Sequence, residues 1–208
     1  MQTRLYARLA TAACFTLLTA CVTSTTVDQV WHDQTRTTAP IGKTLVIVVA
    51  PRKDTSVALE SEWVAQLGKR GVDASALHSA LPGESQVDQQ RVVELVKSRG
   101  IDTVLISGWV EKKIAQQERS SMAPDPGLQS GSYADTYAAF QSNPTIDATA
   151  SYSVDQEVAV VETKLYDGKT EKMFWSARSD TMLNDYIAQL MHDFVKLTIK
   201  EMAKTNTL

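Results

Sequence analysis

The pentapeptide KRGVD at residues 69–73 recurs with similar chemistry as SRGID at residues 98–102. Each copy has the form of a helix exit. A basic residue faces the carboxyl end of the helix dipole, glycine suits the left-handed position after the helix, and an aliphatic residue can pack back on the last turn. The two copies therefore predict two helices that each lead into a strand, first near residues 72–77 and then at 103–110.

The residues before the first copy predict a strand followed by a helix. Residues 45–50 read LVIVVA, a continuous apolar run typical of a central strand that is covered on both faces. Leu59, Trp63 and Leu67 recur every four residues and would share one face of a helix over 57–70. Trp63 is expected to pack in the core.

Between the two copies, the sequence predicts a second helix. Residues 85–88 (SQVD) resemble a capping box, and Val92, Leu95 and Val96 form an apolar stripe at helical spacing. The chain thus alternates strand and helix from residue 44 to residue 110. This β-α-β-α-β order predicts three parallel strands joined by right-handed crossovers.

The last part of the chain adds an antiparallel hairpin and a helix. Residues 152–167 regain strand character, Asp167-Gly168 is a strong turn signal, and residues 172–180 would form the returning strand, in which Trp175 is expected to be buried. Residues 185–203 place their apolar side chains on one helical face. We therefore predict a single α/β domain over residues 44–208, with a mixed sheet of about five strands.

The segment from Lys113 to Ser151 is rich in Pro, Gly and Ser, and it is much longer than the usual connection of about 4–6 residues. Such a loop is either functional or disordered. Within it, Tyr133, Tyr137 and Phe140 fall four and three residues apart, a helical spacing. This predicts a short amphipathic turn whose aromatic side chains either fold on the sheet or are presented to a partner, and these three are the candidate binding residues.

The first twenty residues resemble a lipoprotein signal peptide. Arg4 and Arg8 precede the apolar run 9–18, and residues 18–21 read LTAC, which is similar to the lipobox. The resemblance implies cleavage before Cys21, which would then carry a diacylglycerol and an amide-linked acyl chain such as palmitate. Three acyl chains together make release from a membrane negligible. The alternative is ordinary cleavage after Ala20, which would leave a soluble periplasmic protein.

Residues 21–43 follow the predicted lipidation site and are rich in threonine, with little apolar periodicity. They are interpreted as the lipidated cysteine and a flexible tether, in which Val30 and Trp31 interrupt the polarity and could dock on the domain. Val22 follows the cysteine. By the best-known sorting rule this implies the periplasmic face of the outer membrane rather than the inner membrane.

The sequence contains no specific catalytic or cofactor-binding motif. His32, His78 and His192 lack the spacing of metal ligands and are interpreted as surface residues, so no metal or other cofactor is predicted. No nucleophile elbow or phosphate-binding glycine loop is present. Glu60 and Glu62 would point to different sides of a helix and are interpreted as solvent-facing. The sequence therefore gives no support for an enzyme.

Charge and cysteine content restrict the partners and the source of stability. The chain has a formal net charge of −3 and no basic cluster longer than Lys112-Lys113, so nucleic acid is not an expected partner. Of the two cysteines, Cys14 lies in the predicted signal peptide and Cys21 would be lipidated. The exported domain should therefore be stabilised by its core rather than by a disulfide.

Several segments resemble a proteobacterial family of uncharacterised lipoproteins. They are residues 59–73, 99–110 and 162–167, together with Lys169 and residues 175–177. The predicted topology is similar to that of the amino-terminal domain of TolB and of the curli-secretion channel lipoprotein. The resemblance implies a setting in the cell envelope and no particular reaction.

These observations favour a non-catalytic envelope lipoprotein that acts as a binding or assembly module for another envelope protein or polymer. One alternative is a subunit of an oligomeric outer-membrane secretion pore. The spacing of Tyr133, Tyr137 and Phe140 disfavours it, because a barrel strand needs alternating apolar positions over about 9–11 residues. The other alternative is a hydrolase without a recognisable motif.

Overall fold

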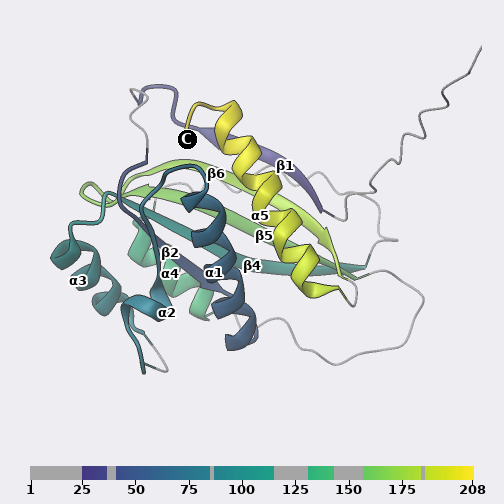
Figure 1. Cartoon of the computed structure of the whole chain (residues 1–208), viewed down its shortest axis with the longest axis horizontal. Helices are drawn as coiled ribbons and strands as arrows, with labels where there is room; N and C mark the ends of the chain where they lie inside the picture. Colours follow the sequence, from purple (N-terminus) through teal and green to yellow (C-terminus); the bar gives the residue numbers. More distant parts are fainter. Residues whose placement is uncertain (1–24, 37–40, 85–86, 115–130, 143–156, 184–185) are drawn as a thin grey trace, which may run out of the picture.

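The computed structural model describes residues 25–36, 41–84, 87–114, 131–142, 157–183 and 186–208. These residues form one six-stranded mixed sheet, in the order β1-β6-β5-β4-β2-β3, with helices on both of its faces (Figure 1). The predicted α/β class is confirmed, and the sheet has six strands where about five were predicted. The strands are β1 (Thr25–His32), β2 (Thr44–Val49), β3 (Ala74–Ala76), β4 (Thr103–Ile114), β5 (Glu157–Asp167) and β6 (Met173–Met182), and the helices are α1 (Lys53–Gly68), α2 (Leu77–Ala80), α3 (Gln89–Arg99), α4 (Tyr133–Ser142) and α5 (Ile187–Lys204).

The parallel half of the sheet follows the prediction. β2 lies between β3 and β4 and is parallel to both, with Thr44 opposite Ala74 on one side and Thr103 on the other. Residues 44–48 of β2 are buried, as expected for a strand covered on both faces. β5 and β6 form the predicted antiparallel hairpin, in which Trp175 is fully buried.

The two helix exits predicted from the repeated pentapeptide are also confirmed. Gly71 and Gly100 have φ angles of 80° and 59°, in the left-handed region that favours glycine. The residue after each glycine donates its backbone N–H to the preceding helix, Val72 to Leu67 at 3.2 Å and Ile101 to Val96 at 3.0 Å. The start of α3 differs from the prediction. Its cap is Asp88, whose carboxylate accepts from the Arg91 N–H at 2.7 Å, and Ser85 lies outside the described residues.

The interpretation of residues 21–43 as a flexible tether is wrong for residues 25–32. They form β1, which pairs antiparallel with β6, and the hydroxyls of Thr25 and Thr181 lie 3.0 Å apart. Among the described residues, β1 is an edge strand that pairs with β6 alone. Most of its side chains are exposed and its burial pattern shows no regular alternation. A bulge between Asp28 and Trp31, with Gln29 at a φ of 49°, bends the strand and protects its open edge from further pairing.

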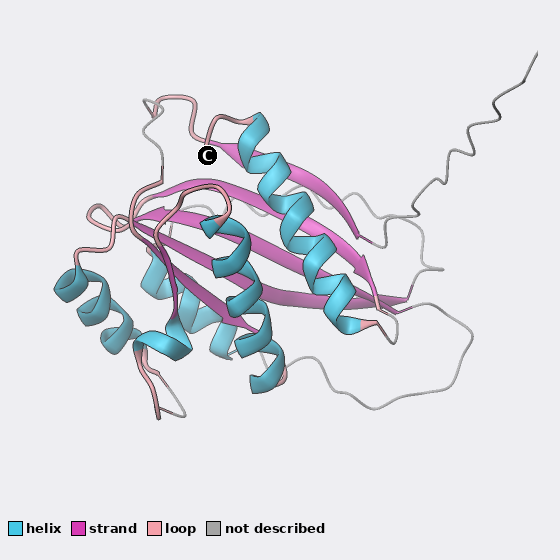
Figure 2. Ribbon diagram, viewed as in Figure 1, coloured by secondary structure: helices cyan, strands magenta, loops and turns pink. Residues whose placement is uncertain are grey.

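The helices divide the core between the two faces of the sheet. α1 and α5 pack on one face, here called the α1/α5 face, whose buried side chains include Trp63 and Phe194. α2, α3 and α4 pack on the other, here called the α4 face, whose buried side chains include Tyr137 and Tyr166. Figure 2 shows α1 and α5 in front of the sheet and α4 behind it.

The long segment from Lys113 to Ser151 contains an ordered element. β4 extends to Ile114, and α4 forms within the segment from Tyr133 to Ser142, while residues 115–130 and 143–156 lie outside the described residues. α4 lies close to β4 because Gly108 has no side chain. A Cβ atom at Gly108 would lie 2.5 Å from the ring of Phe140.

The two ends of the sheet have different neighbours. At one end, here called the hairpin end, lie the turn between β5 and β6, the last residue of β1 and the residues that follow α5. At the other end, here called the Thr25 end, lie Thr25, Met182 and the start of α5. β6 connects the two ends, and its length separates them by about 30 Å.

Candidate functional site

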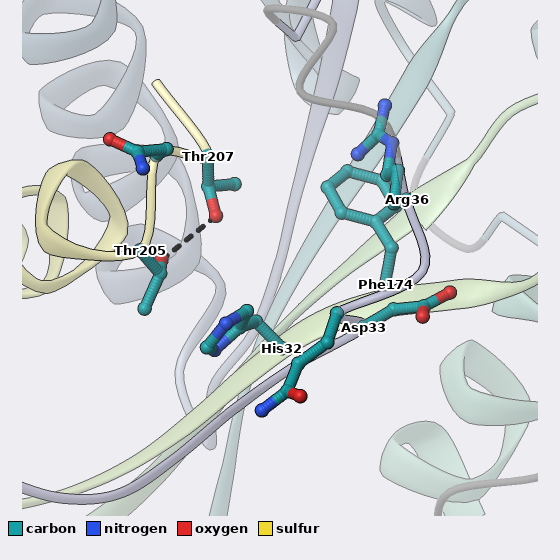
Figure 3. A pocket seen from close by; sticks show the side chains of 8 residues that line it. His32, Asp33, Arg36, Phe174, Thr205 and Thr207 are labelled. Carbon is teal, nitrogen blue, oxygen red and sulfur yellow. Dashed lines mark hydrogen bonds between the residues drawn. The ribbon is translucent and has the colours of Figure 1, made fainter.

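The hairpin end carries a pocket of about 200 Å³ that three separate segments build. Figure 3 shows Thr205 and Thr207 on one side of it and Arg36 and Phe174 on the other, with His32 between them and the carboxylate of Asp33 directed away from the threonines. The segment after β1, the start of β6 and the segment after α5 therefore meet here, although they lie far apart in the sequence. The lining residues are His32, Asp33, Gln34, Arg36, Phe174, Thr205, Asn206 and Thr207.

Asp33 holds the segment after β1 against the sheet. Its backbone N–H donates to the carbonyl of Phe174 at 2.9 Å, which continues the pairing of β1 with β6. Its carboxylate accepts from the hydroxyl of Thr35 at 2.7 Å and from the Thr35 N–H at 2.9 Å. These two hydrogen bonds lower the pKa of the Asp33 carboxyl below its ordinary value. The carboxylate is thus used to form a turn, which directs Arg36 back over β6.

Arg36 and Phe174 form the aromatic and cationic side of the pocket. The guanidinium carbon of Arg36 lies 3.5 Å from the centroid of the Phe174 ring, a cation–π contact. Burial lowers the pKa of Arg36, while Asp167 and Asp33 act in the opposite direction, and an arginine stays charged at neutral pH. Because the ring fixes one face of the guanidinium, its N–H groups are oriented for a planar acceptor such as a carboxylate or a peptide carbonyl.

Asp167, in the adjacent turn, adds to the negative charge around Arg36. Burial would raise the pKa of Asp167, but its carboxyl accepts hydrogen bonds from the backbone and hydroxyl of Thr170 and from the backbone of Lys169. These bonds, together with the charge of Arg36, hold the pKa below its ordinary value. The turn between β5 and β6 therefore interacts with the segment after β1 in two ways. The charges of Asp167 and Arg36 attract each other, and Asp33 pairs with Phe174 of β6 through the backbone.

The residues after α5 form the other side of the pocket. The indole N–H of buried Trp175 donates to the hydroxyl oxygen of Thr205 at 3.1 Å, and the hydroxyls of Thr205 and Thr207 lie 2.9 Å apart. Asn206, between them, has a φ of 52°, a conformation that asparagine tolerates better than most residues. The end of the chain is thus fixed to the sheet, and it offers hydroxyl and amide groups to the pocket.

A second hollow of about 340 Å³ adjoins the first. It shares His32, Asp33 and Gln34 with the first and adds Val30 and Trp31. Trp31 is 36% exposed and Val30 is 37% exposed, so both are unusually accessible for apolar side chains. Tryptophan and arginine beside polar groups are the composition typical of protein contact sites. The small volume of each hollow suits a protruding side chain or a chain end better than an enclosed small ligand.

The three binding residues predicted from the sequence are buried on the α4 face. Tyr133, Tyr137 and Phe140 are 0%, 4% and 9% exposed, and they pack against the sheet. The hydroxyl of Tyr137 donates to the carbonyl of Val87 at 2.9 Å. Of the two possibilities left open for these side chains, the structure shows the one in which they fold on the sheet. A contact with a partner would require α4 to leave it.

Buried Glu60 and partly exposed His78 form a pair that the sequence interpretation missed. Glu60 was expected to face solvent, yet it is 3% exposed, and its carboxylate lies 2.6 Å from Nδ1 of His78. The same carboxylate accepts from the backbone N–H of Val48 at 3.1 Å and from that of His78 at 3.0 Å. β3 ends before it reaches Val48, so Glu60 replaces the missing strand partner. This pair has a structural function, since it joins α1, β2 and α2.

The remaining predicted sites are either dispersed or outside the described residues. Cys21 lies outside the described residues. His32 lines the pocket, His78 pairs with Glu60, and His192 lies 2.9 Å from a carboxylate oxygen of Glu62. Among the described residues, no group of three or more histidine, cysteine or acidic side chains is arranged to hold a metal ion. None of the described helices is long and apolar enough to cross a membrane.

Comparison with known proteins gives structural neighbours only. No family model matches the sequence, and no curated protein matches it. The fold is similar to that of the PelC dodecamer from Paraburkholderia phytofirmans, with 12% identity, a TM-score of 0.49, and coverage of 84% of this chain and 94% of that chain. It is also similar to lipoprotein GNA1162 from Neisseria meningitidis, with 14% identity, a TM-score of 0.41, and coverage of 79% and 99%. The resemblance to the lipoprotein family and to TolB stays a prediction.

Only the second hollow carries a weak signal in the sequence. Val30 and Trp31 are the two apolar residues that interrupt a polar segment, and this pattern indicates that they could dock. The pocket beside them has no such signal, because Arg36, Phe174 and Thr205 come together only through the pairing of β1 with β6 and the return of α5. No local pattern encodes such a meeting of distant segments.

Proposed function

We propose that the chain is a non-catalytic, lipid-anchored binding module of the cell envelope, held by Cys21 at the periplasmic face of the outer membrane. In this proposal, the hairpin end contacts another envelope protein. The observation that supports it most is the pair of adjoining hollows, where exposed Trp31 and the Arg36–Phe174 stack lie beside the hydroxyl and amide groups of the carboxyl-terminal segment. Such a surface can recognise a carboxylate or a peptide carbonyl together with an apolar side chain.

The arrangement favours binding over catalysis. The carboxylate of Asp33 is occupied by Thr35, and that of Glu60 by two backbone amides and His78. A general base needs a carboxylate or imidazole directed at a substrate position. Apart from His32 and Asp33, the groups that line the hollows are a guanidinium, amides, hydroxyls and aromatic rings, which recognise a partner without transforming it.

The anchor is tested by changing Cys21 to Ser in the full-length chain. We expect the unchanged protein to sediment with membranes and the C21S protein to be soluble or to remain as an uncleaved precursor, because the acyl chains have no attachment site without the thiol. The mass of the purified amino-terminal peptide checks the modification directly. An unacylated terminus in the unchanged protein would contradict the proposed anchoring.

The contact surface is tested with a photo-crosslinking residue at Gln34, which both hollows share. We expect one discrete crosslinked product in intact cells. It should be lost on Arg36→Ala or Trp31→Ala, because each change removes a main contact group. The matched control is the same crosslinker at Lys97, an exposed position on α3. A product that forms equally from both positions, or that survives both substitutions, would contradict the assignment of the partner to the hairpin end.

A further inference from the structure

The exposed apolar side chains of the described residues gather at opposite ends of the sheet. Val30 and Trp31 belong to the hairpin end described above. The others are Met182, Tyr186 and Ile187, which are 38%, 75% and 51% exposed. They lie at the end of β6 and the start of α5, and both of these places are at the Thr25 end. The proposed contact surface does not account for this second group.

Ile187 is the first residue of α5 and belongs to the apolar stripe of this helix. It shares a helical face with Leu190 and Phe194, which are buried against the sheet at 5% and 4% exposure. One turn earlier on the same stripe, the side chain of Ile187 is not covered and is 51% exposed. Tyr186 precedes it directly, and Met182 lies four residues before Tyr186, which limits their separation to about 14 Å.

The predicted lipid anchor is attached at this same end. Thr25 pairs with Thr181, the residue before Met182. Cys21 is only four positions before Thr25, so the lipidated residue can lie no more than about 14 Å from the start of β1. Because β1 is part of the sheet rather than of a tether, this short distance holds the whole Thr25 end near the membrane.

We infer that the Thr25 end rests on the bilayer, with Met182, Tyr186 and Ile187 in contact with the lipid interface. This inference depends on the proposed lipidation of Cys21. Tyrosine and aliphatic side chains together are suited to the boundary between headgroups and acyl chains. Lys112 and Glu157 lie at the same end and pair at 2.7 Å, so this pair places no net charge before the headgroups. The hairpin end would then face away from the membrane, about 30 Å from it.

The test measures the depth of a fluorescent label on the full-length, lipidated protein in vesicles of phosphatidylethanolamine and phosphatidylglycerol. A single cysteine is introduced as Ile187→Cys or Met182→Cys and labelled with an environment-sensitive dye. The introduced thiol is the only one expected to react, because Cys14 lies in the predicted signal peptide and the sulfur of Cys21 would be acylated. Lys169→Cys, an exposed position at the hairpin end, is the matched control.

We expect the emission of both labels at the Thr25 end to shift to the blue on reconstitution and to lose most of its intensity when the vesicles contain a lipid-bound quencher. The Lys169→Cys label should do neither. Equal quenching at the two ends, on a chain whose acylation is verified by mass, would overturn the inference and leave the proposed anchoring intact. A chain without acylation would overturn both.

Discussion

The two faces of the sheet are covered by different kinds of structure. On the α1/α5 face, two long helices of 16 and 18 residues bury an apolar core in which Trp63 meets Phe194 edge to face at 5.9 Å. On the α4 face, shorter helices bury several hydroxyl groups together with their aromatic rings. The first face is held mainly by hydrophobic packing. The second also requires the close approach of α4 to β4 and the hydrogen bonds made by the hydroxyls of Tyr137 and Tyr166. We therefore expect it to be the face whose helix can be released separately.

The largest effect is expected from Trp63→Ala, which removes the centre of the α1/α5 face. Trp63 is fully buried, and its loss should lower the free energy of unfolding by about 3–5 kcal/mol. The whole domain should be affected, because α1 and α5 also cover strands that support the α4 face. Chemical denaturation followed by circular dichroism measures this change.

The matched control for this prediction is Trp31→Ala, the same substitution at a partly exposed position on an edge strand. Its unfolding free energy should stay close to that of the unchanged protein. Equal destabilisation by the two substitutions would show that the α1/α5 core does not dominate stability.

A smaller and more local effect is expected from Gly108→Val on the α4 face. The new side chain would occupy the space of the Phe140 ring, which a Cβ atom would approach to 2.5 Å. Overpacking of this kind costs about 1–3 kcal/mol, and we expect α4 to move off the sheet while the other face stays folded. Hydrogen exchange should then show loss of protection in α4 and little change in α5.

Gly68→Ala is the control for the Gly108→Val substitution. It lies at the end of α1, where a Cβ atom would have no other atom within 4 Å, so alanine should leave stability unchanged or raise it slightly. If α4 keeps its hydrogen-exchange protection in the Gly108→Val protein, then the packing of α4 on the sheet does not depend on the absence of a side chain at residue 108.

This contrast also explains which parts of the fold could be predicted from the sequence. The α1/α5 face and the parallel strands were predictable because continuous apolar runs, four-residue spacing and glycine exits are local signals of secondary structure. β1 was not, since an edge strand with a bulge and mostly exposed side chains has no periodicity. α4 was detected only by the spacing of Tyr133, Tyr137 and Phe140, and its docking depends on Gly108, a residue in a different element.

The candidate site was less predictable than the fold for a related reason. Charge and polarity suggested that Glu60 faces solvent, yet it is buried because β3 is too short to satisfy the Val48 amide. Arg36 stacks on Phe174 only because β1 pairs with β6. In both cases the deciding partner belongs to another segment, and sequence spacing carries no information about it.

An alkaline pH should also distinguish the two faces. Burial raises the pKa of Tyr133, Tyr137 and Tyr166 to about 12, and all three lie on the α4 face. The pKa of these tyrosines in the folded protein is above the unfolded value of about 10. The contribution of the protonated hydroxyls to the free energy of unfolding is therefore fully present below a pH of about 10, and it is lost as the pH rises through the folded pKa. We expect loss of α4 packing between these two values, measured by tyrosinate absorbance and near-ultraviolet circular dichroism.

The double variant Tyr137→Phe and Tyr166→Phe serves as the control for the alkaline transition. It keeps the rings and removes two of the three titrating hydroxyls, so its transition should be weaker and occur at higher pH. An unchanged transition would assign the alkaline instability to other groups.

The smallest effect is expected from Thr136→Val, which leaves a buried polar group without its partner. The hydroxyls of Thr136 and Tyr166 lie 2.6 Å apart across the interface between α4 and β5, and both residues are buried. Valine matches the shape of threonine but cannot form this bond, so we expect a loss of about 1 kcal/mol in the free energy of unfolding.

The comparison with Thr198→Val identifies the origin of this loss. Thr198 is also buried, on α5, but its hydroxyl donates to the carbonyl of Phe194 within the same helix. Valine there removes no hydrogen bond between elements, so the substitution should cost less than Thr136→Val. Adding Tyr166→Phe to Thr136→Val should restore part of the lost stability, because no hydroxyl then remains unpaired across the interface. If it restores none, the α4 face is held by packing in the same way as the α1/α5 face, and the difference between the two faces lies in geometry alone.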